Sequence, residues 1–405
     1  MEDKPGFPDN IHVPKGFSFS AVRAGIKVSG RPDVALATVS CGASAAALFT
    51  QNRVVAAPLV VGRSSLAKTK GRVRAVIVNA GNANCATGKA GVEACQEVCH
   101  ETAKALGIKP EEVFPSSTGI IGVPLPQDKI IANLPGLVAN SEAGVEGVKQ
   151  FAGAIMTTDL RPKVASIKAK AGKAEFSLLG IAKGSGMIHP QMATMLVYLF
   201  TDIAAGTKDL QRMLKSTCDE TFNCISVDGD TSTNDTLLLL ASGQSGARLQ
   251  DAPVAKKFNA ALLEVCRSLA FQVVSDGEGV KHVIRLSIEQ AKNREEGMRV
   301  AKSIAHSPLV KTAWAGADPN WGRILAAVGY SGAPVKTERI EIWIARQRVF
   351  AQGVVQRFNE MEAHRALAQP SCEVRVKLGR GKSAVLFYTT DLTSEYVHIN
   401  ADYST

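Results

Sequence analysis

One stretch of the sequence, residues 183–200, changes character halfway along. Its first part, residues 183–194, mixes two glycines, a His-Pro step, a lysine and hydroxyl residues, whereas residues 195–200 form an unbroken apolar run. A run of that length predicts a β-strand buried on both faces. Thr194 then stands at the mouth of a buried strand after a flexible glycine-rich approach, a position that suits a nucleophile. The alternative that these residues leave open is a glycine-rich turn before an ordinary core strand.

The composition is that of a globular protein. Of the 405 residues, 45% are apolar, 21% are charged and 5% are aromatic, which is usual for α/β proteins and enough to bury a large core. No stretch reaches the ~20 apolar residues that a membrane helix needs. The N-terminal residues include acids and prolines where a signal peptide has a basic start and an apolar run. We therefore expect a cytoplasmic protein with no membrane partner.

The eight cysteines contain no C-x-x-C pair, and several fall on apolar helix faces. We expect reduced thiols in the core. Cys95, Cys99 and His100 lack a second ligand pair at the spacing of a zinc site, so no metal site is expected.

The net charge of +10 is spread along the chain without a run of five basic residues. The densest cluster, Lys168, Lys170 and Lys173, suits the solvated face of a hairpin. Dispersed positive charge attracts small anionic substrates. We expect no nucleic-acid partner.

Strand, loop and helix patterns alternate along the N-terminal half. Residues 74–79 are typical of a buried strand that leads into a small-residue loop at 80–88. A helix with an apolar face follows and stops at Gly107. A second loop, rich in hydroxyl groups, is expected at 116–119, and a helix led by Ser141 comes after it.

The C-terminal half continues this alternation. Asp251 precedes the clearest helix pattern of the chain, with Pro253 in its first turn. Strands are expected around 280–288 and 340–344, and a further strand pair is expected to be joined across residues 379–381. Strands often joined as hairpins, alternating with helices, predict an α/β (α+β) fold of layered sheets covered by helices, not a doubly wound parallel sheet.

Three familiar motifs begin in this sequence and fail. Gly184 and Gly186 start a dinucleotide fingerprint, but His189 stands at the third glycine and no helix pattern follows. Residues 381–383 imitate the end of a phosphate-binding loop without its first glycine. Residues 228–235 lack the glycine and closing acid of a calcium loop. They instead predict a turn whose Asp and Thr side chains bond to the backbone.

A set of segments, in order along the chain, resembles the ornithine acetyltransferase (glutamate N-acetyltransferase) family of arginine biosynthesis. The resemblance runs from about residue 25 to the end and is more specific than any short motif. The segments are SSTGIIG (116–122), KGSGMIHPQMATML (183–196), DGDTSTND (228–235), SDGEG (275–279), DPNWGR (318–323) and NADY (400–403).

The resemblance implies a self-processing fold of the N-terminal nucleophile type. The precursor would cut itself between Ala193 and Thr194, giving an α chain of residues 1–193 and a β chain of residues 194–405. Two of each would associate as a heterotetramer. The cut would free the α-amine of Thr194, whose pKa of about 7.7 to 8.0 lies near neutrality and lets it act as the base for its own hydroxyl. His189, a rival base, is then not needed.

The implied reaction has two steps. Thr194 takes the acetyl group of N-acetylornithine, and the amine of glutamate then removes it. The oxyanion donors would be Thr118 and Gly119, for which the residues alone leave open a simple turn. The implied substrate-binding residues are Thr157, Thr158, Lys183, Thr194, Glu278, Asn400 and Thr405.

Charge supports two of these assignments, since Lys183 suits a carboxylate and Glu278 the ammonium of ornithine. The alternative for Glu278 is a surface acid after a helix. A role for Thr405 requires the C-terminal tail to fold back into the site. Gln191 and Leu160 depart from the family pattern beside these residues, which bears on the choice of acceptor.

No bound cofactor is expected, and acetyl-CoA stays open as a second acetyl donor. Two alternatives to the transferase also stay open. One is an aminopeptidase-like hydrolase on the same self-cleaving scaffold, in which water takes the acyl group. The other is a binding protein that keeps the pocket and never cuts itself.

Overall fold

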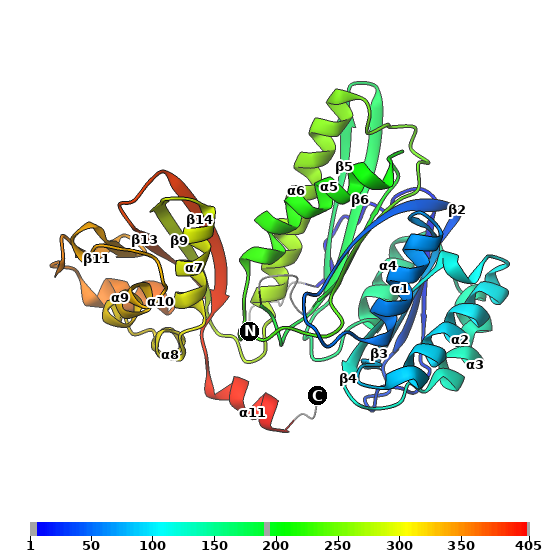
Figure 1. Ribbon diagram of the computed structural model, residues 1–405, viewed down its shortest axis with the longest axis horizontal. Coiled ribbons are helices and arrows are strands. Elements are labelled where there is room, and N and C mark those ends of the chain that lie inside the picture. Colours follow the sequence, from blue (N-terminus) through cyan, green and yellow to red (C-terminus); the bar gives the residue numbers. More distant parts are fainter. Residues whose placement is uncertain (1–5, 190–194, 403–405) are drawn as a thin grey trace.

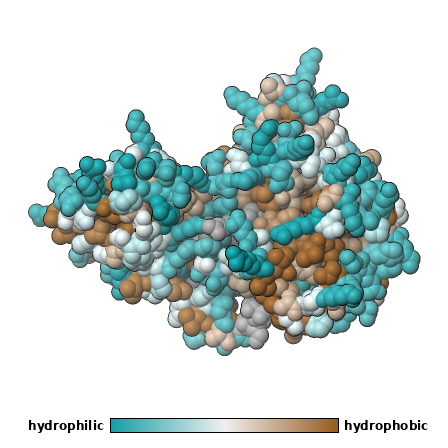
Figure 2. Space-filling model, in the orientation of Figure 1, coloured by the Kyte–Doolittle hydropathy of each residue, from teal (hydrophilic) through white to brown (hydrophobic). Residues whose placement is uncertain are grey.

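The computed structural model describes residues 6–189 and 195–402, which form a larger and a smaller lobe (Figure 1). Each lobe is built on its own β-sheet. The space-filling view shows the smaller lobe standing out from the larger one, with a notch between them (Figure 2). Within the described ranges, no helix is long and apolar enough to cross a membrane.

The larger lobe contains a mixed sheet of eight strands within the described residues. Across it the strands run β4 (Val113–Ile120), β3 (Arg72–Asn82), β2 (Val34–Phe49), β8 (Thr236–Ala241), β7 (Leu196–Thr201), β6 (Ala174–Lys183) and β5 (Lys163–Ala171), and β1 (Phe17–Val22) pairs with the first part of β2.

Only two of these pairings, β3 with β4 and β7 with β8, are parallel among the described strands. The parallel pair β7 and β8 places the start of β7 beside the start of β8, and Asn234, just before β8, bonds to the end of β4. Helices cover the sheet: α1 (Ala57–Lys68), α2 (Gly88–Leu106), α3 (Gln127–Ala139), α4 (Val145–Ala154), α5 (Thr207–Glu220) and α6 (Ala252–Ser275), with 3₁₀ turns at Pro110–Glu112 and Phe222–Cys224.

Strand β7 lies in the middle of this lobe and is buried on both faces, as its apolar run predicts. Val197 and Leu199 point to a core shared with α5 and α6. Tyr198 and Phe200 point to the opposite core, shared with α4. Alternate residues of a strand face opposite sides of its sheet, so an all-apolar sequence is required where helices cover both sides.

The smaller lobe has a sheet of six strands among the described residues, and α11 leaves it to return to the larger lobe (Figure 1). Its strands run in the order β12 (Val354–Val355), β11 (Gln347–Ala351), β10 (Glu341–Ile344), β13 (Ser371–Lys377), β9 (Val283–Ala291) and β14 (Ser383–Thr390). Its helices are α7 (Arg294–Ala305), α8 (Pro308–Ala315), α9 (Trp321–Gly329), α10 (Glu360–Leu367) and α11 (Ser394–Asp402), with a 3₁₀ turn at Thr337–Arg339.

The layered α/β prediction is confirmed, and several local predictions also hold. Helix α2 ends at Gly107, which adopts a left-handed φ of 64°. Pro253 lies in the first turn of α6. The lysine-rich hairpin exists as β5 and β6, where Lys168 pairs with Glu175.

Other local predictions are wrong. The segment 116–119 is the end of β4 and not a loop. The helix expected after Ser141 begins only at Val145, after Gly144. The strands on either side of residues 379–381 do not pair with each other, because β9 lies between β13 and β14.

The cysteines follow the prediction with one exception. All eight lie in the described part, and none of them forms a disulfide there. Cys95 and Cys99 are buried on α2, whereas Cys41 is exposed.

The packing around β7 predicts a large cost for removing Phe200. Its ring contacts Phe17 and Phe19 edge-on, with centroids 5.2 and 5.0 Å away. Phe200→Ala should cost ~3–5 kcal/mol of stability because it leaves a cavity between packed rings. The measurement is the thermal midpoint. Leu160→Ala is the control, because Leu160 is 70% exposed, and equal midpoints for the two variants would contradict the packing.

Candidate active site

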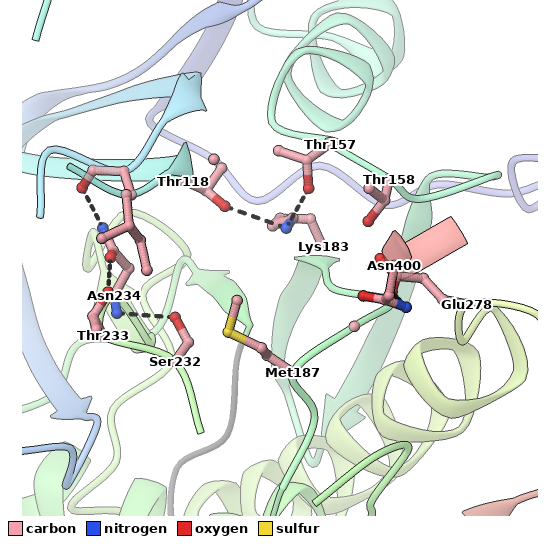
Figure 3. A pocket seen from close by; sticks show the side chains of 14 residues that line it. Thr118, Thr157, Thr158, Lys183, Met187, Ser232, Thr233, Asn234, Glu278 and Asn400 are labelled. Atoms are coloured by element: carbon pink, nitrogen blue, oxygen red, sulfur yellow. Dashed lines mark hydrogen bonds between the residues drawn. The ribbon is translucent and has the colours of Figure 1, made fainter. Parts of the chain in front are cut away.

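A polar pocket lies where the ends of β4 and β6 meet the connection after α4 (Figure 3). Helix α11 and the connection after α6 close it from another side. It is lined by Ala83, Thr118, Gly119, Ile121, Thr157, Thr158, Lys183, Gly186, Met187, Ser232, Thr233, Asn234, Glu278 and Asn400.

Lys183, the last residue of β6, is the central cation of the pocket. Its Nζ donates to Thr157 Oγ1 at 2.8 Å and to Thr118 Oγ1 at 3.3 Å (Figure 3). Asp159 Oδ2 lies 3.8 Å away. Burial lowers the pKa of Lys183, and the charge of Asp159 opposes this shift.

Asp159 is the buried anion behind Lys183. Its Oδ1 accepts from Lys163 Nζ and from the Gly184 amide, each at 2.6 Å, and its Oδ2 accepts from the Thr157 amide at 3.0 Å. Burial favours the neutral form, but the charges of Lys163 and Lys183 outweigh it. They hold the pKa of Asp159 well below its usual range. The Asp159 carboxylate thus holds the backbone at Thr157 and at Gly184, the residue after Lys183.

Glu278 supplies the negative wall. Its Oε2 accepts from Asn400 Nδ2 at 3.0 Å, and its amide donates to Ser185 O at 3.0 Å. A Cβ on Gly186 would lie 2.5 Å from Glu278 Oε2, so a side chain there would displace the Glu278 carboxylate. Glu278 is therefore part of the pocket and not an ordinary surface acid.

The C-terminal helix α11 reaches this wall through a close backbone approach. Gly279 has a φ of +66°, and a Cβ on it would collide with the backbone nitrogen of Tyr396. Thr393 Oγ1 donates to Gly279 O at 2.6 Å. The chain after the smaller lobe is thereby brought back to the pocket, where Asn400 lies.

Thr118 and Gly119 lie near the end of β4, where Thr118 contacts Lys183. Because Thr118 Oγ1 accepts from Lys183, its own hydrogen can be donated into the pocket. Gly119 has a φ of +133°, and a Cβ on it would collide with the backbone of Gly81 in β3. Only glycine fits there.

A further wall, residues 232–234, was not predicted. Asn234 Nδ2 donates to Ala83 O at 2.7 Å and to Ser117 O at 2.9 Å, so it fixes this wall to the ends of β3 and β4. The DGDTSTND segment that contains it carries part of the family resemblance, but the sequence assigns it no site residue and predicts an Asp- and Thr-rich turn. That interpretation is confirmed for Asp228, which accepts backbone amides.

Of the remaining predicted residues, two are described by the structure and four are not. Thr158 lines the pocket, with its hydroxyl 2.7 Å from Ser185 Oγ, whereas Leu160 is exposed. Ala193, Thr194, Gln191 and Thr405 lie outside the described residues.

His189 does not line the pocket. Its ring lies against that of His306, with centroids 4.7 Å apart. Burial lowers the pKa of His189 to about 4. Because His189 is neutral at physiological pH and its ring packs against His306, it has a structural role.

The pocket is lined by a cation, Lys183, and a carboxylate, Glu278, and the hydroxyl groups of Thr157 and Thr158 lie near them (Figure 3). That arrangement suits a small molecule with both a carboxylate and an ammonium group. Within residues 6–189 and 195–402, no group of three or more His, Cys, Asp or Glu could hold a metal ion.

The fold and the pocket thus define a layered α/β protein with a site for a small amino-acid-like molecule. The sequence matches the model of the ArgJ family over residues 18–405. The chain belongs to the ArgJ family.

Two curated relatives are similar over almost their whole length. The arginine biosynthesis bifunctional protein ArgJ of Geobacter sulfurreducens is 43% identical over 395 residues, covering 96% of this chain and 99% of the relative. The protein of the same name from Thermus thermophilus is 44% identical over 397 residues, covering 98% and 100%.

Two solved structures are similar to part of the chain. The arginine biosynthesis bifunctional protein ArgJ of Bacillus halodurans is 39% identical, with a TM-score of 0.42, covering 44% of this chain and 92% of that one. The ornithine acetyltransferase of Mycobacterium tuberculosis, complexed with ornithine, is 37% identical, with a TM-score of 0.38 and the same coverage.

The buried ion pairs around Asp159 predict a specific pH dependence. Asp159→Asn leaves Lys183 without a carboxylate within 4.0 Å among the described residues, and breaking such a pair costs ~3–5 kcal/mol. Because the pKa of Asp159 is depressed by folding, its contribution is complete above the unfolded pKa of about 3.9 and is lost as the pH falls through the folded value. The difference in thermal midpoint between wild type and Asp159→Asn should therefore stay constant from pH 7 to about pH 4. A difference that already shrinks between pH 7 and pH 5 would contradict this assignment.

Proposed function

We propose that this protein transfers the acetyl group of N-acetylornithine to glutamate in arginine biosynthesis, through an acetyl ester on Thr194. The observation that carries the proposal is that Lys183 and Glu278 line the same pocket, where Lys183 bonds to the Thr118 hydroxyl. Lys183 would hold the α-carboxylate of either substrate. Glu278 would hold the side-chain ammonium of ornithine. Membership of the ArgJ family supports the same reaction.

In the first step, the Thr194 hydroxyl attacks the acetyl carbonyl carbon and its proton passes to the freed α-amine of Thr194. The negative charge that develops on the carbonyl oxygen is stabilised by donors from Thr118 and Gly119. The C–N bond of N-acetylornithine then breaks, and the proton moves to the departing amine. The amine of glutamate attacks the acetyl ester in the second step, which restores the Thr194 hydroxyl.

The position of the proposed cut explains how two chains stay together. It would separate residues 1–193 from residues 194–405 between β6 and β7. These strands pair antiparallel from Leu178↔Thr201 to Lys183↔Leu196. The α and β chains would therefore share one sheet and its two cores.

We propose a heterotetramer of two α and two β chains in the cytoplasm as the working form. The protein needs no bound cofactor in this proposal. Acetyl-CoA is proposed as a second donor, and the bifunctional names of the relatives support testing it. Assays of glutamate acetylation with each donor alone separate the two activities.

Self-cleavage is the first test. Wild type should give two fragments in intact mass spectrometry under denaturing conditions, with Thr194 at the start of the second, and Thr194→Ala should give only the full-length chain and no acetyl transfer. A wild-type chain that stays whole after full maturation would contradict the proposal. Rapid release of acetate from N-acetylornithine without glutamate would favour the hydrolase instead.

The Thr118 hydroxyl gives a second test. Thr118→Val keeps the shape and removes the donor, so kcat should fall by about 10²–10³ with little change in KM. Thr312→Val is the control, because Thr312 is an exposed residue of α8. An unchanged kcat for Thr118→Val would show that its hydroxyl is not an oxyanion donor.

A further inference from the structure

The described residues on either side of 190–194 are bonded to one continuous segment, residues 226–236. On the N-terminal side, Asp228 uses both carboxylate oxygens. Its Oδ2 accepts from the Met187 amide at 2.7 Å, and its Oδ1 accepts from the Ile188 amide at 2.9 Å. Two neighbouring amides are thus held by one side chain.

The carbonyl of Ile188 is held by the same segment. It accepts from the Val227 amide and from Ser226 Oγ, each at 2.9 Å. Ile188 is fully buried. The amide and the carbonyl of Ile188 are therefore both held by residues 226–228.

The C-terminal side is held in a similar way. The Met195 amide donates to Asp235 Oδ1 at 3.0 Å, and the Met195 carbonyl accepts from the Thr236 amide at 3.1 Å. Asp235 is 2% exposed.

These bonds bear directly on the peptide units around the proposed cut. The Met195 amide belongs to the same planar peptide unit as the Thr194 carbonyl. The bond to Asp235 therefore holds the chain at the residue directly after the proposed nucleophile. On the N-terminal side, the bonds from Met187 and Ile188 to Asp228 hold the chain before residues 190–194 in the same way.

We propose that residues 226–236 are a template for self-cleavage, and that Asp228 and Asp235 are its positioning residues. The inference rests on the proposed function, because it takes Ala193–Thr194 as the bond that is cut. In that reaction the Thr194 oxygen forms an ester with the Ala193 carbonyl carbon, and the C–N bond breaks as the hydroxyl proton passes to the released amine. Water then hydrolyses the ester to the Ala193 carboxylate and the Thr194 hydroxyl.

The template acts by reducing the freedom of the reacting segment. An intramolecular attack needs its atoms about 3–3.5 Å apart and aligned, and a misplacement of about 1 Å can cost 10²-fold in rate. Both ends of the segment are fixed to residues less than a dozen positions apart in sequence. Loss of either anchor therefore reduces the fraction of chains aligned for attack.

The test compares cleavage rates in the full-length chain, followed by denaturing intact mass after synthesis in a cell-free system. Asp228→Ala and Asp235→Ala should each slow cleavage between about tenfold and a hundredfold. Asp235→Asn keeps the single acceptor that Met195 uses and should restore most of the rate. Asp228→Asn keeps one acceptor oxygen for the amides of Met187, Ile188 and Asp230, and its rate should fall between.

Two matched controls separate positioning from general damage. Asp230→Ala changes an exposed acid of the same segment, and Tyr396→Phe removes only the bond from Tyr396 to Asp228 Oδ2. Both should cleave at the wild-type rate, and thermal midpoints should show that the slow variants are folded.

Wild-type rates for Asp228→Ala and Asp235→Ala would overturn the inference. Should the alanine variants fail to fold, the asparagine pair decides. Slower cleavage by Asp228→Asn than by Asp235→Asn supports the template, and wild-type rates for both overturn it. Thr194→Ala is run in parallel. If wild type is cut and Thr194→Ala is not, failure of the Asp variants to slow cleavage rejects the template alone, whereas an uncut wild type rejects the proposed function as well.

Discussion

The pairing of β6 with β7 is the interaction on which the rest of this structure depends. Its register places Lys183, at the end of β6, opposite Leu196, at the start of β7. The residue proposed to hold the substrate is therefore fixed beside the strand that follows the proposed nucleophile. Both strands are buried between two apolar cores, so the register is strongly specified: a slip by one residue would exchange every side chain between those cores.

The pocket uses this fixed centre to combine parts that are distant in sequence. Asp159 lies 3.8 Å from the cation, and Glu278 lines the same pocket from the connection after α6. Helix α11 adds Asn400 after the chain has passed through the whole smaller lobe. Gly279 makes that return possible, because any side chain there would collide with Tyr396. The smaller lobe thus contributes to the site through the helix that follows it.

The sequence predicts what local physics decides. The apolar run at 195–200 predicts a strand covered on both faces, and Gly107 ends α2 because it adopts a left-handed conformation. Long-range contacts were missed. No local pattern shows that β9 separates β13 from β14, or that Asn234 joins the ends of β3 and β4. The site residues were proposed through the family resemblance. Their meeting in one pocket depends on the pairing of β6 with β7 and of β7 with β8 and on the return of α11, none of which periodicity reveals.

The central claim is that the acetyl group is carried by Thr194 within this pocket. The direct measurement is peptide-level mass spectrometry of protein mixed with N-acetylornithine and quenched in acid before glutamate is added. We predict one acetyl group on the first residue of the fragment that begins with Thr194, and its loss when glutamate is present. Full transfer activity with an acetyl group on another residue, or with none on Thr194, would contradict the account.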